Sequence, residues 1–394
     1  MSTFDIGKAK RETRAADGMI HFNNAGSSMM PSPVADALYA YLQKEELIGG
    51  YETAAAEKDA LDNFYIASAK LLNCDPDEIA FIENATRAWD MAFYSFRFEP
   101  GDKIVTSISE YGSNVIAMIQ QAKRYGAEVV FVPDDEYGQL DIVALENLLD
   151  ENVKLIAISH IPTGGGLVNP AAAVGKVANK AGIPYLLDSC QGVGQLSLDV
   201  QAIGCDMLSG TGRKFLRGPR GTGLLYVRRE FAKTLEPVML DQHAATLVSA
   251  TEYTVRDDVK KFENWEQNFA GKVALGVAID YALEWGLEAI QERVYELSAD
   301  LRAKLSAIDG VTVADGGAEK CGLVTFMTQQ KDAEAIKTAL AVHRINVTVS
   351  DGSGSFVSFE KRGIKALVRA SLHYFNDVEE IDRFIDVLKT ILAA

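Results

Sequence analysis

The sequence predicts an α/β protein that has a large domain built on a mostly parallel sheet and a small C-terminal α+β domain. Between residues 34 and 230, short apolar runs alternate with helical patterns, as in central strands that helices cover on both faces. Beyond residue 268, two long helical stretches precede shorter, mixed elements. The length of 394 residues also favours more than one domain. We expect an arm at 1–18, a large domain at 19–284 and a small domain at 285–394.

The elements of the large domain follow from the spacing of apolar residues. Helical spacing predicts helices near 34–47, 54–72, 85–96, 113–125, 141–149 and 170–181. Runs that are apolar on both faces predict strands at IAFI (79–82), KIVTS (103–107), EVVFV (128–132), KLIAIS (154–159) and PYLLD (184–188). A further strand, GTGLLYVRRE (221–230), follows a glycine-rich turn.

The small domain follows the long helices expected within 268–307. Its expected strands lie in VTVADGG (311–317), GLVTFMT (322–328), INVTVS (345–350) and ALVRASLHY (366–374), and its helices at 332–343 and 377–392. The Gly/Ser-rich segment 350–363 is expected to be a loop, and such loops often border functional sites.

Composition and charge exclude several classes of function. Hydrophobic residues make up 48% of the chain, which argues against disorder. The 39 basic and 55 acidic residues give a net charge of −16, which disfavours binding to nucleic acid or to anionic membranes. The N-terminus lacks an apolar signal region, and no run of 18 apolar residues occurs, so we expect a cytoplasmic protein.

The four cysteines stand at 74, 190, 205 and 321. They form no CxxC pair and no cluster with zinc-ligand spacing. We therefore expect no metal site, and we interpret the cysteines as small buried side chains in a reduced compartment.

Two residues of the large domain have the right chemistry for a site. Asp188 closes the run PYLLD, where a carboxylate is costly unless it is solvated or meets a cation; a helix cap is the alternative. Lys214 lies in SGTGRKFLRGPRGTG. It is either a surface charge or a Schiff-base nucleophile whose pKa Arg213 and Arg217 would lower.

Two further segments suit anions. ENATRAWD (83–90) opens a helix, and the free N–H groups of Ala85, Thr86 and Arg87 could hold a phosphate; a plain capping turn is the alternative. Arg369 lies in the apolar strand ALVRASLHY. It needs an anion there, either a carboxylate ligand or an internal ion-pair partner.

Taken together, DSCQ (188–191), the lysine in GRKF (212–215) and RAS (369–371) form a recognisable set. With them, the chain from HFNNAGSS (21–28) to residue 377 resembles the fold-type I pyridoxal-phosphate enzymes of the class V aminotransferase family. The nearest resemblance is to the branch of cysteine desulfurases, C–S lyases and isopenicillin-N-epimerase-like proteins. It implies a cofactor-binding large domain with a seven-stranded type of sheet, and pyridoxal 5′-phosphate as the cofactor.

The resemblance also implies roles for residues around the cofactor. Lys214 would form the Schiff base and carry the proton at the substrate Cα. Asp188 would pair with the pyridinium nitrogen, which keeps the ring an electron sink, and Gln191 would hydrogen-bond the phenolic oxygen. The phosphate would be held by Ala85, Thr86, Arg87, Thr211 and Arg213.

The remaining positions border the ring and the substrate. Tyr111 would stack on the ring and take part in catalysis. Thr163 would contact the cofactor, and the substrate would meet Asn24, His160 and Arg369, the last through its α-carboxylate. The family usually carries His in place of Tyr111 and Arg213, and desulfurases usually carry Asn in place of Thr163.

The expected reaction follows from an absence. Desulfurases use a nucleophilic cysteine on the loop before the substrate-binding arginine, and 346–366 contains no cysteine. We therefore exclude a desulfurase and expect a C–S lyase type of β-elimination that gives a 2-oxo acid and ammonia. An epimerase or an aminotransferase on the same scaffold is the alternative, and a catalytically silent cofactor-binding regulatory protein is a remote one.

A homodimer is expected from the same resemblance. Desulfurases carry Gly-Thr at the positions of Trp265 and Glu266, where it reaches the phosphate of the other subunit. We expect Trp265 and Glu266 to lie near the neighbouring subunit's substrate mouth, with plain interface packing as the alternative.

Overall fold

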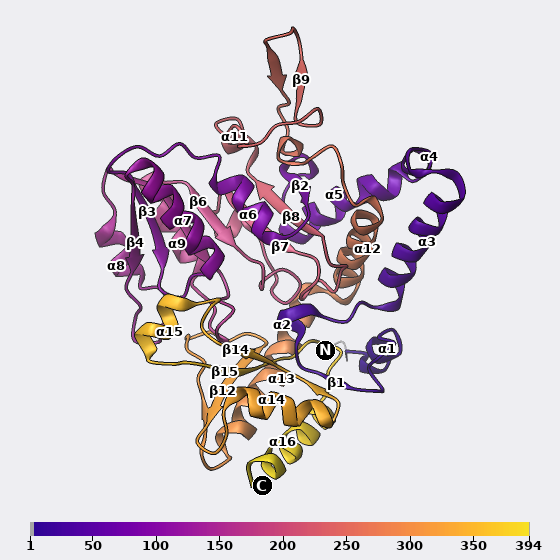
Figure 1. Cartoon of the computed structure of the whole chain (residues 1–394), viewed down its shortest axis with the longest axis vertical. Coiled ribbons are helices and arrows are strands. Elements are labelled where there is room, and N and C mark those ends of the chain that lie inside the picture. Colours follow the sequence, from indigo (N-terminus) through magenta and orange to yellow (C-terminus); the bar gives the residue numbers. More distant parts are fainter. Residues whose placement is uncertain (1–3, 394) are drawn as a thin grey trace.

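A seven-stranded sheet organises the large part of the molecule (Figure 1). The computed structural model describes residues 4–393. The strand order is β2-β8-β7-β6-β5-β3-β4, and only β8 runs antiparallel to its neighbours. This confirms the predicted mostly parallel sheet. The strands are β2 (Ile79–Ile82), β3 (Lys103–Ser107), β4 (Glu128–Val132), β5 (Val153–Ser159), β6 (Tyr185–Asp188), β7 (Met207–Thr211) and β8 (Gly223–Val227).

Helices cover both faces of this sheet, because successive strand residues point into different cores. Leu187 of β6 packs into one buried cluster, which also contains residues of α5 and α12. Leu186 packs into the other, with Trp89 and Met118. The apolar runs are thus buried on both sides, as expected for central parallel strands. The helices are α3 (Ser32–Ile48), α4 (Gly50–Ala56), α5 (Lys58–Leu72), α6 (Ala85–Phe93), α7 (Gly112–Tyr125), α8 (Ile142–Leu148), α9 (Ala171–Ala181) and α12 (Phe269–Trp285).

The C-terminal part carries a second, antiparallel sheet of order β11-β12-β15-β14, as the predicted α+β arrangement requires. Its strands are β11 (Val311–Val313), β12 (Leu323–Thr328), β14 (Thr348–Ser350) and β15 (Leu367–Ser371). Its other elements are α13 (Leu287–Ser306), α14 (Ala333–Val342), α16 (Val378–Ala393) and β13 (Ile345–Asn346), which pairs with β1 (Ile20–His21). The domain boundary at residue 284 stays a prediction; it lies one residue before the end of α12.

The N-terminal arm contains a helix that its polar composition did not reveal, α1 (Ile6–Arg11). Lys10 pairs with Asp377 and lies 3.4 Å from Glu380, at the start of α16. The Tyr281 hydroxyl of α12 donates to Glu12 at 2.6 Å. The arm therefore contacts both the large sheet's helices and the C-terminal helix. The first three residues of the predicted arm lie outside the described residues.

Several predicted elements differ from the observed ones. The helix expected at 54–72 is two helices, since the chain bends at Glu57 between α4 and α5. The strand expected at 221–230 ends at Val227, and α11 (Arg229–Ala232) follows. Strand β7 was missed because its sequence MLSGT is not an apolar run, although all five residues are buried. The expected loop at 350–363 contains α15 (Phe356–Arg362). The other short elements are α2 (Asn24–Ser27), η1 (Pro76–Glu78), α10 (Val200–Ile203) and η2 (Val259–Phe262).

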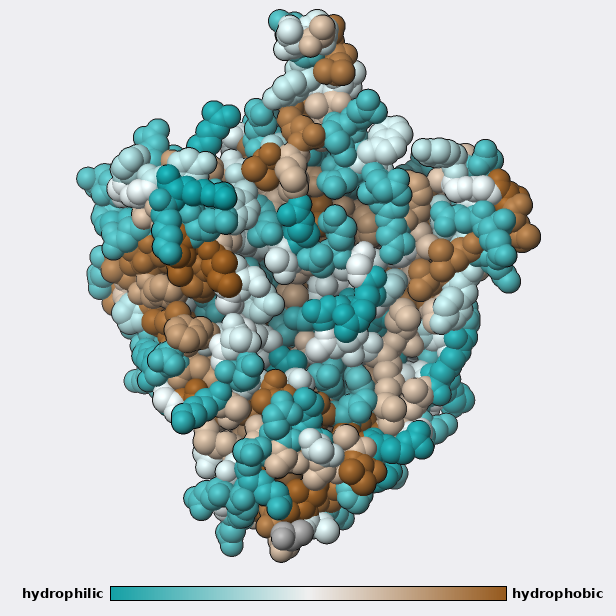
Figure 2. Space-filling view, viewed as in Figure 1, coloured by the Kyte–Doolittle hydropathy of each residue, from teal (hydrophilic) through white to brown (hydrophobic). Residues whose placement is uncertain are grey.

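A hairpin of β9 (Ala245–Leu247) and β10 (Tyr253–Val255) projects from the body at the top of Figure 1. Its short, exposed strands gave no period-two pattern in the sequence. Figure 2 shows apolar surface on this hairpin and at the corner between α3 and α4. Among residues 4–393, no helix combines the length and the apolar character that a membrane span needs.

Candidate active site

A cavity of about 340 Å³ lies where β5, β6 and β7 end, at the edge of the sheet where ligands bind in open α/β folds. A larger hollow of about 880 Å³ lies at the opposite edge, beside the start of β5, and none of the predicted residues lines it. Nine predicted residues from distant segments line the smaller cavity: Ala85, Thr86, Tyr111, Thr163, Asp188, Gln191, Thr211, Arg213 and Lys214.

Lys214 follows β7 and is only 8% exposed. Burial lowers the pKa of its amine, and the charges of Arg213 and Arg369 lower that pKa further. A lowered pKa raises the fraction of neutral amine, which is the nucleophilic form. The lysine is thus prepared for covalent chemistry by its position and not by a base beside it.

Asp188 closes β6 in a buried position, as the run PYLLD predicted. Asn114 donates to its Oδ2 at 2.9 Å, and the backbone N–H of Cys190 donates to Oδ1 at 2.9 Å. Burial raises the pKa of Asp188. Within the described residues, no lysine or arginine lies within ion-pair distance of this carboxylate, so a cationic partner would be strongly favoured there.

Glu110 is a buried acid of the site that sequence reasoning missed. Its carboxylate accepts hydrogen bonds from the backbone N–H and hydroxyl of Ser159, both at 2.6 Å, and from the backbone N–H of Tyr111 at 2.9 Å. Asn114 donates to it at 2.8 Å and so links it to Asp188. Burial raises the pKa of Glu110 to about 7. Its position directly after β3, at the same sheet edge as Asp188, was the available signal.

The expected phosphate-binding end is formed by the start of α6. Ala85 and Thr86 line the cavity there, and the first N–H groups of a helix have no carbonyl partner inside it. Arg87 differs from these two residues. Its backbone N–H donates to the Asn84 side chain at 3.0 Å, and its guanidinium lies 3.9 Å from Asp90. Arg87 does not line the cavity. Arg213 does, and its guanidinium donates to the carbonyl of Gly26.

Arg369 of β15 lies behind Thr163 and does not itself line the cavity. It is 7% exposed, and its Nη1 donates to the carbonyl and hydroxyl oxygens of Thr163 at 3.0 and 2.6 Å. Its buried Nε has no hydrogen-bond partner. Burial lowers the pKa of Arg369 to about 10, with a contribution from nearby Arg213. Residues 4–393 supply no acidic partner for it, so the geometry favours an external carboxylate over an internal ion pair.

Two residues predicted at the substrate mouth lie away from the cavity. Asn24 is fully buried, donates to the Ser371 carbonyl at 2.8 Å and accepts from Ser28 at 2.7 Å. It joins α2 to the end of β15. His160 lies 3.4 Å from the Ser189 hydroxyl, and burial lowers its pKa to about 4, so it is neutral at pH 7. Both residues support the walls.

The loop between β14 and α15 covers the substrate side. The backbone N–H of Gly112 donates to the Gly354 carbonyl at 3.0 Å. A Cβ atom on Gly354 would lie 2.6 Å from the Thr163 side chain, so only glycine allows this approach. The loop therefore packs directly on the residues that follow Tyr111 and on Thr163.

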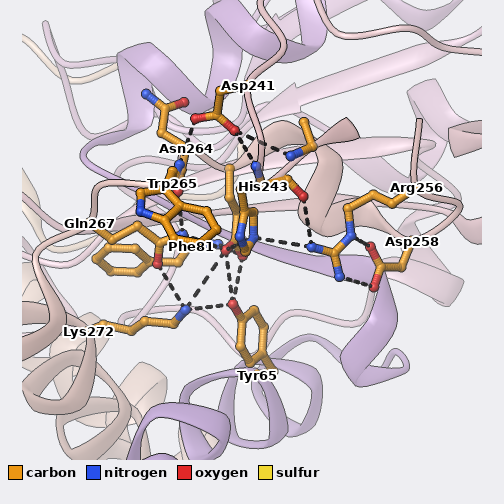
Figure 3. A network of polar contacts seen from close by, with 12 residues as sticks. Tyr65, Phe81, Asp241, His243, Arg256, Asp258, Asn264, Trp265, Gln267 and Lys272 are labelled. Atoms are coloured by element: carbon orange, nitrogen blue, oxygen red, sulfur yellow. Dashed lines mark hydrogen bonds and ion pairs between the residues drawn. The ribbon is translucent and has the colours of Figure 1, made fainter. Parts of the chain in front are cut away.

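A polar cluster lies beside the segment that carries Trp265 (Figure 3). We call Tyr65, His243, Glu263, Gln267 and Lys272 the Glu263 cluster. Glu263 accepts from the Tyr65 hydroxyl at 2.8 Å and from the Phe81 backbone at 2.8 Å, and Lys272 lies 3.9 Å away. The next residues are exposed: Trp265 is 56% exposed, with its N–H bonded to Asp241 at 2.6 Å. Neither Trp265 nor Glu266 lines the cavity of its own chain.

The groups around the cavity fit pyridoxal phosphate. Within the described residues, the buried Oε1 of Gln191 and the buried Nε of Arg369 have no hydrogen-bond partner, and no lysine or arginine pairs with Asp188. The cofactor offers an aldehyde for Lys214, a pyridinium nitrogen for Asp188, a phenolic oxygen near Gln191 and a phosphate for the α6 terminus. Each of these four cofactor groups therefore has a candidate partner at the cavity.

The fold and this residue set define a class of pyridoxal-phosphate protein, and comparison with known proteins identifies it. The chain belongs to the class V aminotransferase family, whose model matches residues 20–384. The family resemblance and the fold type are thereby confirmed, and the cofactor is pyridoxal 5′-phosphate.

The particular relatives are cysteine desulfurases. A probable cysteine desulfurase of Methanothermobacter thermautotrophicus is 30% identical over 398 residues, covering 99% of this chain and 98% of the relative. The apo structure of the cysteine desulfurase of Thermococcus onnurineus is 25% identical, with a TM-score of 0.92 and 98% of each chain covered. The cystine C–S lyase C-DES, solved with glycine covalently linked to its pyridoxal-phosphate cofactor, shares the fold at 22% identity, with a TM-score of 0.87 and 96% and 98% covered.

These relatives correct the expected reaction. The exclusion of a desulfurase is wrong, because proteins named as desulfurases match nearly the whole chain. The epimerase, the aminotransferase and the silent regulatory protein fall with it, whereas the C–S lyase reading in its broad sense, cleavage of a carbon–sulfur bond with pyridoxal phosphate, fits these relatives.

Proposed function

We propose that this chain removes sulfur from cysteine with pyridoxal 5′-phosphate, at the sheet-edge cavity. The observation that carries the proposal is a set of buried charged groups, Lys214, Asp188 and Arg369, which have no opposite charge within ion-pair distance among the described residues and match the needs of a cofactor-bound amino acid. The names of the relatives supply the substrate, cysteine. In this reading, residues 19–284 hold the cofactor and 285–394 supply Arg369.

The roles of the cofactor-binding residues follow from their positions. When bound, pyridoxal phosphate supplies a ring that takes up electrons released at the substrate Cα. Lys214 holds the cofactor covalently and then moves the Cα proton. The Asp188 carboxylate keeps the ring nitrogen protonated, and Asn114 and Cys190 N–H orient that carboxylate. Gln191 meets the phenolic oxygen, and Ala85, Thr86, Thr211 and Arg213 hold the phosphate.

The substrate-side residues orient the amino acid. Arg369 binds the α-carboxylate, and its bonds to Thr163 fix the plane of the guanidinium. Tyr111 lies against the ring, and the bond from its N–H to Glu110 holds the turn that carries it. Asn24 and His160 act only by holding the neighbouring walls. This arrangement fixes the Cα–H bond relative to the ring, which orients as well as binds.

We also propose a cytoplasmic homodimer that binds neither nucleic acid nor membrane. The projecting hairpin exposes Leu247 and Val248, and the α3–α4 corner exposes Leu47 and Tyr51, and exposed apolar groups of this kind favour an interface (Figure 2). The Trp265 side chain is exposed as well. Its backbone N–H donates to Asp241, which lies just before the hairpin. In the dimer, Trp265 and Glu266 lie near the neighbouring subunit's cavity.

The function is tested by product analysis. The cofactor-loaded protein is incubated with cysteine and dithiothreitol, and alanine, sulfide, pyruvate and ammonia are measured. The proposal expects alanine and sulfide in equal amounts. Pyruvate and ammonia in place of alanine, or no product at all, would contradict it.

A further inference from the structure

Removal of sulfur from cysteine needs a second thiol, and this inference rests on the proposed function. The Cβ–S bond of cysteine breaks and Cβ gains a proton, which gives alanine. The sulfur forms a new S–S bond to the acceptor, so a thiol R–SH is oxidised to the persulfide R–S–SH. Cysteine plus R–SH thus balances alanine plus R–S–SH. The question is which thiol the molecule offers.

Three of the four cysteines are remote from the cavity. Cys205 and Cys321 are fully buried in the core, and burial raises the pKa of each to about 12. Cys74 follows α5, and burial raises its pKa as well. None of the three lines the cavity. They are packed side chains, and a protonated thiol is a poor nucleophile.

Among the described residues, Cys190 is the cysteine that lines the cavity. Its N–H is bonded to Asp188, the residue that would hold the ring nitrogen of a bound cofactor. Arg369 and Thr163, which would hold the substrate carboxylate, belong to other segments. Burial raises the pKa of the Cys190 thiol. In the proposed function this thiol would therefore face the cofactor ring and not the substrate sulfur.

The covering loop offers hydroxyl groups in place of a thiol. It packs on the substrate side through Gly354, and its side chains there include Ser353 and Ser355. The Ser353 hydroxyl donates to Asp351 at 2.7 Å, and Ser355 is 2% exposed. A serine hydroxyl cannot take up sulfur as a persulfide. The wall nearest the substrate therefore carries no acceptor among the described residues.

We infer that the sulfur acceptor is a small-molecule thiol that enters the cavity from outside this chain. The cavity of about 340 Å³ has to hold cofactor and amino acid together, so the space that remains beside them suits a compact thiol. The acceptor's class is set by chemistry: a compact, soluble thiol, including a second molecule of cysteine.

The inference is tested by single-turnover measurement with the cofactor-loaded protein in excess over cysteine, so that no second cysteine serves as acceptor. Alanine and the intact mass of the protein are measured with and without 2-mercaptoethanol. We expect the thiol to raise alanine formation about tenfold or more, with no sulfur added to the protein. Cys190→Ala is expected to keep the same dependence on added thiol.

Two outcomes would overturn the inference and are distinguishable. Stoichiometric alanine without added thiol, together with a persulfide on the wild-type protein, assigns the acceptor to the chain, and loss of that persulfide in Cys190→Ala assigns it to Cys190. The proposed function survives this result. No alanine under any condition overturns the proposed function itself. If Cys190→Ala does not fold, the intact mass of the wild-type protein still shows whether the chain itself accepts sulfur.

Discussion

Two groups of buried charge in this molecule differ in how they are paired. In the Glu263 cluster, Lys272 donates to Tyr65 at 2.6 Å and to Gln267 at 3.1 Å, and His243 lies 3.2 Å from Glu263. At the cavity, Lys214, Asp188 and Arg369 have no opposite charge within ion-pair distance in the described residues. Glu263 and Lys272 are as buried as Lys214, Asp188 and Arg369, so burial alone does not distinguish the two groups.

This difference in charge pairing distinguishes a structural cluster from a candidate functional site. A buried charge costs several kcal/mol unless partners compensate it, and native proteins pair nearly all such groups. The Glu263 cluster is compensated inside the chain and anchors the segment before α12 against β2. The cavity groups are compensated only when a ligand with complementary charges binds. Unpaired buried charge, more than charge itself, marks the candidate active site.

The largest expected effect concerns two of the buried lysines, Lys214 and Lys272. Lys214→Ala should abolish both cofactor linkage and turnover, because the Schiff-base amine is lost. Lys272→Met is the matched control: it leaves Glu263 without its cation and should lower stability by about 3 to 5 kcal/mol, with the cofactor still bound. Visible absorbance and urea unfolding measure the two effects. Equal loss of cofactor in both variants would remove the distinction.

Asp188→Asn should lower turnover by about 100-fold or more, since the charge that protonates the ring nitrogen is lost. The shape and the bond to Asn114 can be kept, so the thermal midpoint should change little. Steady-state alanine formation and thermal unfolding give both numbers. Near-normal turnover in a cofactor-loaded Asp188→Asn protein refutes the electron-sink role.

Arg369→Lys should raise KM and lower kcat, with a combined loss of about 1.5 to 3 kcal/mol in kcat/KM. Lysine keeps the charge but loses the two-pronged geometry that a carboxylate needs. Arg302→Lys is the matched control, because Arg302 already pairs with Asp315 at 2.8 Å and should affect stability only. Unchanged kinetics in Arg369→Lys would make Arg369 a structural residue.

The smallest effect is a pH dependence from Glu110, whose pKa rises from 4.5 to about 7. Between these values the folded protein holds the proton that the unfolded chain has released. This group's contribution to stability is therefore full below pH 4.5 and is lost as the pH rises towards 7, by at most about 1.4 kcal/mol per pH unit. Glu110→Gln should remove that slope from urea unfolding measured across pH 4.5–7. The same pH dependence of the unfolding free energy in the wild type and in Glu110→Gln would contradict this prediction.

The sequence predicted the elements that carry long apolar patterns and the site residues that carry a motif. Strands 79–82, 103–107 and 128–132 match β2, β3 and β4 residue for residue. Strand β7 was missed because small polar residues become buried only by tertiary contacts. Asn114 was missed for a similar reason: its contact with Asp188 joins residues 74 positions apart and leaves no local spacing to read. Glu110 is linked to Asp188 only through Asn114.

The reaction was mispredicted for a different reason. The loop does lack a cysteine. This one absence was allowed to outweigh the resemblance of nearly the whole chain to desulfurases. In the proposed function, Arg369 and Lys214 would meet the bound amino acid, whereas the loop would bear only on the sulfur's destination. Residues that act on different steps of a reaction require separate arguments.

The most direct test of the account is to locate the cofactor on the protein. The holoprotein is reduced with borohydride, digested and analysed by peptide mass spectrometry. Lys214 competes for the assignment with two other buried lysines, Lys261 and Lys272, since burial lowers the pKa of all three, that of Lys272 to about 8. The account predicts the pyridoxyl group on the peptide that contains Lys214 and none on the peptides that contain Lys261 or Lys272. A pyridoxyl group on Lys261 or Lys272, or on none of the three lysines, would contradict it.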